Sequence, residues 1–223
     1  MTVTISEIKK SARWSLKGNW GLGVLLTFLL FLLNGVFPMI VETIINGGSP
    51  TWNSTEPPSA WTSLASFIIA LILIPVNISA YWFYLSIARF EGPQISQVFS
   101  IFSNGKTYFK LIGLSIVTGI LVFLWSLLLV IPGIIKSFSY SQAYYLLKDH
   151  PEYTILEAIT ESRKRMDGYK WKYFLLNLSF IGWALLCLLT LGIGFLWLSP
   201  YISTSLGAFY NELISSKDEP IVG

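Results

Sequence analysis

The chain has 223 residues, and only 12% of them are Asp, Glu, Lys or Arg, about half the share that soluble proteins carry. Hydrophobic residues make up 53%, and they fall in runs of about 20 residues, the length that crosses a hydrocarbon layer of about 30 Å. These proportions exclude a soluble cytosolic enzyme, a secreted disulfide scaffold and a disordered chain. They predict an all-α, polytopic membrane protein.

The N-terminal segment resembles a signal peptide, because basic residues precede the first apolar run. These residues are Lys9, Lys10, Arg13 and Lys17. The run itself, residues 20–41, is too long for a signal peptide and has no small-residue cleavage site. We therefore expect it to remain in the protein as the first membrane helix.

Six apolar runs predict six membrane-spanning helices. They cover residues 20–41, 61–88, 109–131, 133–147, 173–191 and 193–213. The fourth run is short and polar, and Pro200 interrupts the sixth. With all six spans and a cytoplasmic N-terminus, fourteen of the 15 basic residues lie on the cytoplasmic side, and only Lys136 lies near the outer face. Removing either irregular span would destroy this asymmetry.

Three segments of the chain follow one pattern, which suggests internal repeats. Each begins with an amphipathic helix and continues with a glycine, aromatic and basic residues, and an apolar hairpin. The glycines, which we expect to end the helices, are Gly18, Gly105 and Gly168. Each hairpin closes with alanine and two aromatic residues: Ala80-Tyr81-Trp82, Ala143-Tyr144-Tyr145 and Ala208-Phe209-Tyr210.

We therefore predict one membrane domain, residues 1–223, made of three parallel hairpin repeats. The repeats cover about residues 3–90, 93–148 and 153–214, and a short polar tail covers residues 215–223. Because each repeat contains two spans, the surface helices and both termini are expected on the cytoplasmic side. The apolar faces that should hold these helices on the membrane contain Ile8 and Ala12, Ile95 and Phe99, and Ala158 and Ser162.

Polar side chains within the spans have two interpretations. They form hydrogen bonds between packed helices, or they line a hydrophilic cavity. The residues are Asn77, Lys136, Ser137, Tyr140, Ser141 and Tyr201. Lys136 also has Glu42 on its own side of the membrane as a partner of opposite charge. In the sixth span, Ser203 and Gly207 have the small-x-x-x-small spacing that lets helices approach closely.

The chain contains few residues that carry chemistry. Its single histidine, His150, lies in a charged loop, and its single cysteine, Cys187, lies in an apolar run. We therefore expect no catalytic site, no cofactor and no metal. A basic cluster before the fifth span predicts contact with anionic lipid headgroups rather than nucleic acid. It contains Arg163, Lys164, Arg165, Lys170 and Lys172.

A set of short motifs links the chain to a known family. They are Ile131-Pro132-Gly133 followed by Tyr140, Gly168 with Trp171, Gly192-Ile193-Gly194, Pro200-Tyr201, and Ala208-Phe209-Tyr210 with Glu212-Leu213. With them the chain resembles, over nearly its whole length, the bacterial integral membrane proteins of domain of unknown function 975 (DUF975). The resemblance implies a multi-pass protein of the bacterial cytoplasmic (plasma) membrane, and it supplies no catalytic residues.

Two classes of function remain. The first is a non-enzymatic protein that organises or assists other membrane components, with the lipid bilayer, anionic headgroups and other membrane proteins as partners. The alternative is a transporter or channel for small solutes or peptides. Charged residues within the spans are scarce, which favours the first class because transport pathways usually carry such residues.

Overall fold

A computed structural model describes residues 3–48 and 57–218. These residues form helices and turns without a strand, which confirms the all-α prediction. The middle of the predicted outer loop and the end of the predicted polar tail lie outside the described residues.

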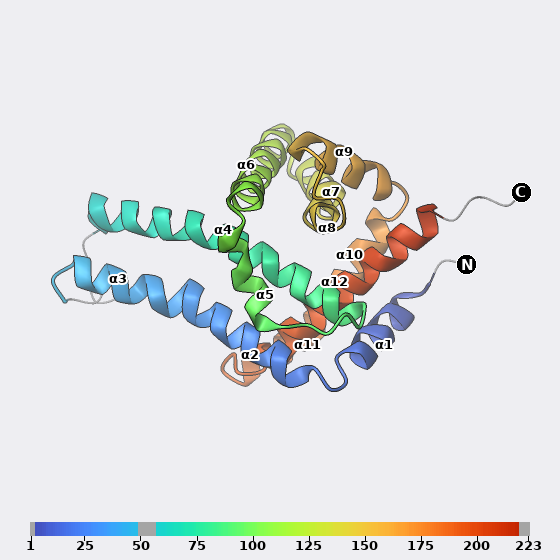
Figure 1. The fold of residues 1–223 in the computed structure, drawn as a ribbon, viewed down its shortest axis with the longest axis horizontal. Coiled ribbons are helices and arrows are strands. Elements are labelled where there is room, and N and C mark those ends of the chain that lie inside the picture. Colours follow the sequence, from blue (N-terminus) through green and yellow to red (C-terminus); the bar gives the residue numbers. More distant parts are fainter. Residues whose placement is uncertain (1–2, 49–56, 219–223) are drawn as a thin grey trace, which may run out of the picture.

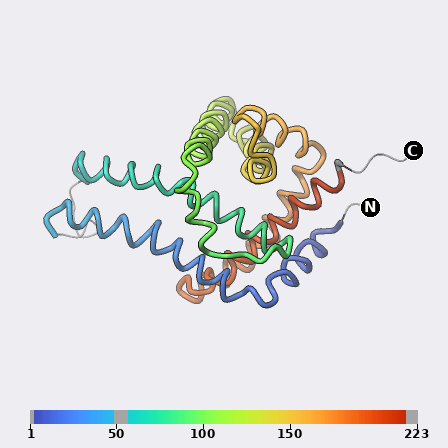
Figure 2. Tube along the Cα trace, in the orientation of Figure 1, coloured from blue at the N-terminus to red at the C-terminus, as the bar shows by residue number. Residues whose placement is uncertain are grey.

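The helices follow one another in three groups. The first contains α1 (Ile5–Ser15), a continuous stretch of α2 (Trp20–Phe31), the π-helical segment η1 (Leu32–Val36) and α3 (Phe37–Ile45), and then α4 (Ala60–Ala88). The second contains α5 (Ile95–Phe99), the 3-10 helix η3 (Ser100–Ser103), α6 (Gly105–Leu128), α7 (Val130–Tyr140) and α8 (Ala143–Asp149). The third contains α9 (Ile155–Arg165), α10 (Lys170–Leu178), α11 (Ile181–Leu189) and α12 (Phe195–Asp218). Helix α3 and the first part of α4 project away from the other helices, opposite α1 and the end of α12, while α2 and the rest of α4 lie among them (Figures 1 and 2).

Four helical stretches are long and apolar enough to cross a membrane. They are Trp20–Ile45, Ala60–Ala88, Gly105–Leu128 and Lys170–Leu189, and they correspond to the first, second, third and fifth predicted spans. The fourth predicted span is divided between α7 and α8 by a turn after Tyr140. The sixth lies in α12, which has 24 residues but is less apolar than these four.

The ends of α1 and α9 follow local sequence rules. Thr4 and Thr154 each form a capping box with the glutamate three residues later. Beyond the helices, Gly18 and Gly168 have φ angles of +91° and +82°, a left-handed conformation that glycine adopts without strain. The prediction that these glycines end the surface helices is therefore confirmed at two positions.

The same prediction is wrong for Gly105. This residue begins α6 instead of ending the preceding helix. The side chain of Asn104 accepts a hydrogen bond from the backbone N–H of Thr107 at 3.1 Å and so caps the N-terminus of α6. A capping side chain beside the glycine determined the boundary here.

The apolar faces of α1 and α9 lie against the protein, which corrects the expectation that they face lipid. Ile8 and Ala12 of α1, and Ala158 of α9, have at most 2% of their surface exposed. In the second group the expected Ile95 and Phe99 are only half-buried, while Val98 and Ile101 are buried. The helix there has five α-helical residues before it becomes a 3-10 helix, whose tighter turn changes which side chains share a face.

The centre of the fold is α12, which crosses α2 and α4 at glycines. A Cβ atom on Gly23 would lie 2.9 Å from Cβ of Pro200, and a Cβ on Gly207 would lie 3.1 Å from Cα of Leu85. Such short distances leave room only for hydrogen at these positions. Gly207, which the small-x-x-x-small spacing singled out, thus lies directly against the backbone of α4.

Candidate functional site

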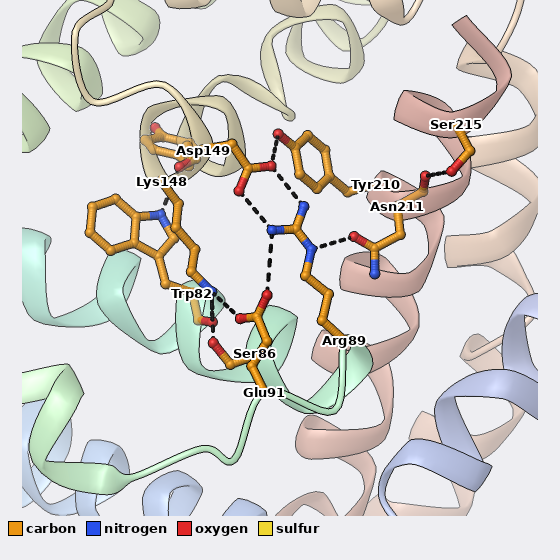
Figure 3. A network of polar contacts seen from close by, with 10 residues as sticks. Trp82, Ser86, Arg89, Glu91, Lys148, Asp149, Tyr210, Asn211 and Ser215 are labelled. Carbon is orange, nitrogen blue, oxygen red and sulfur yellow. Dashed lines mark hydrogen bonds and ion pairs between the residues drawn. The ribbon is translucent and has the colours of Figure 1, made fainter. Parts of the chain in front are cut away.

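The C-terminal ends of α4 and α8 meet the C-terminal half of α12 in a cluster of polar side chains (Figure 3). We call this cluster the three-helix junction. It contains Arg89 and Glu91 from the end of α4 and the turn after it, Lys148 and Asp149 from α8, and Tyr210 and Asn211 from α12.

Arg89 and Asp149 form the central ion pair of the junction. Nη1 and Nη2 of Arg89 each donate to one carboxylate oxygen of Asp149 at 2.7 Å, and Nε donates to Oδ1 of Asn211 at 2.8 Å. The Tyr210 hydroxyl donates to Oδ2 of Asp149 at 2.9 Å. The two ionised side chains are 23% and 19% exposed. Two charge-assisted hydrogen bonds between one arginine and one carboxylate are among the stronger polar contacts in proteins. Together with the bonds to Asn211 and from Tyr210, they connect α4, α8 and α12.

Lys148 forms a second connection between α4 and α8. Its Nζ donates to Oγ of Ser86 at 2.6 Å, to the carbonyl of Trp82 at 3.1 Å and to Oε2 of Glu91 at 3.4 Å. The indole N–H of Trp82 returns a hydrogen bond to the carbonyl of Tyr144 at 2.7 Å. These contacts fix the end of α8 on α4.

The ion pair also shifts the protonation equilibria of its members. Burial alone would raise the pKa of Asp149, but hydrogen bonds from Arg89 and Tyr210 outweigh it and hold the pKa below its ordinary value. The hydrogen bond to Asp149 raises the pKa of Arg89. Burial lowers the pKa of Lys148.

The lowered pKa of Asp149 predicts acid sensitivity of the junction. A carboxyl group whose pKa is lower in the folded state stabilises the fold above its unfolded pKa, and this stabilisation disappears as the pH falls through the folded value. We expect the midpoint of thermal unfolding in detergent to fall more steeply in wild type than in Asp149→Asn between pH 5 and about pH 2, since the ordinary pKa is 3.8. If the midpoint fell equally steeply with pH in both proteins, protonation of Asp149 would not be the cause of the acid sensitivity.

The three alanine-aromatic motifs that close the predicted hairpins meet beside the junction. The ring of Tyr81 lies 6.5 Å from that of Tyr144 and 6.1 Å from that of Tyr145. Tyr145 stacks on Tyr210 at 5.0 Å. One aromatic cluster therefore contains a residue from each motif.

A cavity of about 280 Å³ opens next to this aromatic cluster. Its lining comes from α4, α6, α7, the turn before α8, α8, α10 and α12. The lining residues are Tyr81, Thr118, Val122, Ser137, Tyr140, Ser141, Tyr144, Tyr145, Tyr173 and Leu206. Three residues named from the sequence, Ser137, Tyr140 and Ser141, are thus brought together.

Two other candidates from the sequence lie elsewhere. Asn77 exchanges hydrogen bonds of 2.9 and 3.1 Å with Asn34 across the first hairpin. The hydroxyl of Tyr201 donates to the carbonyl of Lys9 at 3.4 Å, which connects α12 with α1. Both residues serve contacts between helices.

Lys136 is the third candidate outside the cavity lining. Its Nζ lies 4.3 Å from the centre of the Trp125 ring, in a cation–π contact between α7 and α6. Glu42, its possible partner, instead accepts a hydrogen bond from Ser66 at 2.5 Å. The alternative ion pair between Lys136 and Glu42 is therefore not formed.

Most of the basic residues predicted to contact lipid headgroups have acidic neighbours. Lys164 and Arg165 lie 3.8 and 3.0 Å from carboxylate oxygens of Glu161. Nζ of Lys170 lies 3.9 Å from a carboxylate oxygen of Asp167. Lys172 forms a mostly buried ion pair with Glu212. Arg163 is exposed. Much of the charge that suggested this cluster is thus balanced within the protein.

The sequence analysis missed the ion pair of Arg89 and Asp149. Only the alanine-aromatic motifs pointed to this region, and the two residues follow their motifs at different distances: Arg89 comes nine residues after Ala80, and Asp149 six after Ala143. A comparison of repeats therefore does not align them.

A family model described as "Protein of unknown function (DUF975)" matches residues 1–135 and 127–217. The chain belongs to this family. The match confirms the resemblance drawn from the short motifs, and it includes every residue of the three-helix junction of this DUF975 protein. No curated protein and no solved structure matches the chain.

Proposed function

We propose that this DUF975 protein is a non-enzymatic protein of the bacterial cytoplasmic membrane that organises or assists other membrane components. In this proposal it has six spans in three hairpin repeats, three cytoplasmic surface helices and two cytoplasmic termini. The four long apolar helices and the family support a membrane protein. The finer assignments rest on the arguments that follow.

The main support for the proposed topology is the three-helix junction. Three hairpins that start and finish on one side of a membrane bring the ends of their second helices to that side. The C-terminal ends of α4 and α8 and the C-terminal half of α12 meet in the ion pair of Arg89 and Asp149 with Asn211. This meeting agrees with a cytoplasmic position for fourteen of the 15 basic residues.

The topology is tested with reporter fusions that are active only in the cytoplasm. We expect signal from fusions after Gly92, Asp149 and Gly223, and none after Ser54. The physical reason is the positive-inside distribution of Lys and Arg. Signal at Ser54 together with silence at Asp149 would contradict the six-span arrangement.

The organising role is supported by how the interior polar groups are used. The charged side chains of the junction bind one another and hold helices together. Because α1 and α9 turn their apolar faces inward, their polar faces remain available at the membrane surface. A rigid centre with accessible surface helices fits a protein that binds other membrane components.

The cavity favours transport as a second candidate function. Its lining carries hydroxyl groups from α4, α6, α7, α8, α10 and the turn before α8. Thr118 is one of the lining residues, and its Oγ1 is buried without a hydrogen-bond partner among the described residues. A hydrated path through this cavity would satisfy that oxygen.

Cysteine labelling distinguishes the two functions. Single cysteines at Ser137, Tyr140 and Ser141, in a Cys187→Ala background, react with a water-soluble thiol reagent only where water reaches them, because the thiolate is the reactive form. A cysteine at Leu146, which is fully buried, serves as the control. We expect little labelling at positions 140 and 141 in membranes. Strong labelling at both, with none at 146, would replace the organising function with transport.

A further inference from the structure

A second hollow, of about 610 Å³, lies where α1 turns into α2. Gly18 makes this turn with a φ of +91°. The hollow is lined by Lys10, Arg13, Lys17, Trp14 and Trp20, with Glu7 at its other end. We call it the α1 hollow.

Within the described part of the chain, the cations of the α1 hollow form no ion pair with an acidic side chain. Among the described residues, no carboxylate oxygen lies within 4.0 Å of the charged nitrogens of Lys10, Arg13 or Lys17. The carboxylate of Glu7, which also lines the hollow, accepts hydrogen bonds from the backbone N–H and the hydroxyl of Thr4 at 2.6 and 2.8 Å. Three positive charges and one negative charge thus line the hollow, which leaves it with an excess of positive charge.

Two tryptophans at the α1 hollow indicate its depth in the membrane. Trp14 is 65% exposed, and Nζ of Lys17 lies 5.2 Å from the centre of its ring. Trp20 is the first residue of the helix that begins the first apolar stretch. Tryptophan prefers the boundary between headgroups and hydrocarbon, so a membrane position that satisfies both tryptophans would place the α1 hollow at the level of the lipid phosphates.

We infer that the α1 hollow binds the phosphodiester of an anionic phospholipid in the cytoplasmic leaflet. Lys10, Arg13 and Lys17 would donate hydrogen bonds to the phosphate oxygens, and Trp14 would cover the glycerol region of the lipid. The inference rests on the proposed cytoplasmic position of α1. It moves the main headgroup site from the basic residues around α9, where nearby carboxylates already balance much of the charge, to the basic residues of the α1 hollow.

The inference is tested by native mass spectrometry of the full-length protein in neutral detergent, titrated with phosphatidylglycerol or phosphatidylcholine. The variant Lys10→Gln, Arg13→Gln, Lys17→Gln removes the three charges, all of which are exposed. The matched control is Arg163→Gln, Lys164→Gln, Lys170→Gln. We expect the first variant to raise the dissociation constant of the first bound phosphatidylglycerol at least tenfold, and the control to change it less than about twofold. Circular dichroism checks that both variants keep the helix content of wild type.

Three results would overturn the inference. An equal or larger loss in the control variant would place the site near α9. Equal affinity for phosphatidylcholine would show that negative charge is not recognised. Equally tight binding of glycerol 1-phosphate would identify a site for soluble phosphates instead of a lipid. Because binding in detergent does not depend on sidedness, failure here leaves the reporter-fusion result intact, and the two proposals fail separately.

Discussion

Replacing Asp149 with alanine is expected to reduce the free energy of unfolding by about 3 kcal/mol. The substitution removes both oxygens that bind the guanidinium of Arg89, and it leaves the hydroxyl of Tyr210 without its acceptor. Arg89 would keep its hydrogen bond to Asn211, the more distant Glu91, 3.9 Å away, and the ring of Tyr210, whose centre lies 5.7 Å from Cζ. Much of the loss comes from a charge that remains partly buried without a counter-charge.

The matched control for this change is Asp167→Ala. The side chain of Asp167 is 83% exposed and lies 3.9 Å from its cation, Lys170, and exposed pairs of this kind contribute at most about 1 kcal/mol. Both variants are unfolded thermally in the same detergent. If Asp167→Ala lowered the midpoint as much as Asp149→Ala, the junction would not be a special source of stability.

Replacing Gly207 with leucine is expected to separate α12 from α4. The new Cβ would lie 3.1 Å from Cα of Leu85 and 3.5 Å from the carbonyl oxygen of Tyr84, and backbone atoms do not move aside as the end of a flexible side chain does. Overpacking typically costs about 1–3 kcal/mol. We expect a loss at the upper end of this range, because Tyr210 lies within one helical turn of Gly207. A shift of α12 at Gly207 would therefore also disturb the three-helix junction.

The control for this experiment is Gly119→Leu. Gly119 also lies within a long helix, α6, but apart from its chain neighbours and the nearby backbone of α6, no described atom lies within 4 Å of a Cβ at this position. We expect this variant to unfold at or above the wild-type temperature, since leucine favours helix more than glycine does. If both variants lost similar stability, close packing of α12 on α4 at Gly207 would not explain the effect.

The apolar spans were predictable because their signal is local and cumulative. The predicted second span, residues 61–88, nearly coincides with α4, Ala60–Ala88. Each apolar side chain of such a run gains free energy on leaving water, whichever residues it then contacts. The turn that separates α7 from α8 was not predictable in this way, because it occurs among polar residues whose helical periodicity continues across it.

Contacts between distant residues were the least predictable part. The charge cluster before the fifth span suggested free cations, but Lys172 binds Glu212, 40 residues away. Counting charges reveals their total and not their pairing. For the same reason Lys10, Arg13 and Lys17 indicated only the topology in the sequence, and the structure revealed that they line one hollow without an ion pair to any described carboxylate.

The junction also sets an order of events during synthesis. Arg89 is 60 residues from Asp149 and 122 residues from Asn211 along the chain. While the ribosome is still making the third group of helices, Arg89 and Asp149 can already bind each other, but their contacts to Tyr210 and Asn211 do not yet exist. Helix α12 therefore completes a junction whose first member, Arg89, was made 122 residues before Asn211. A nascent chain that stops before Tyr210 lacks the hydrogen bonds from Tyr210 to Asp149 and from Arg89 to Asn211.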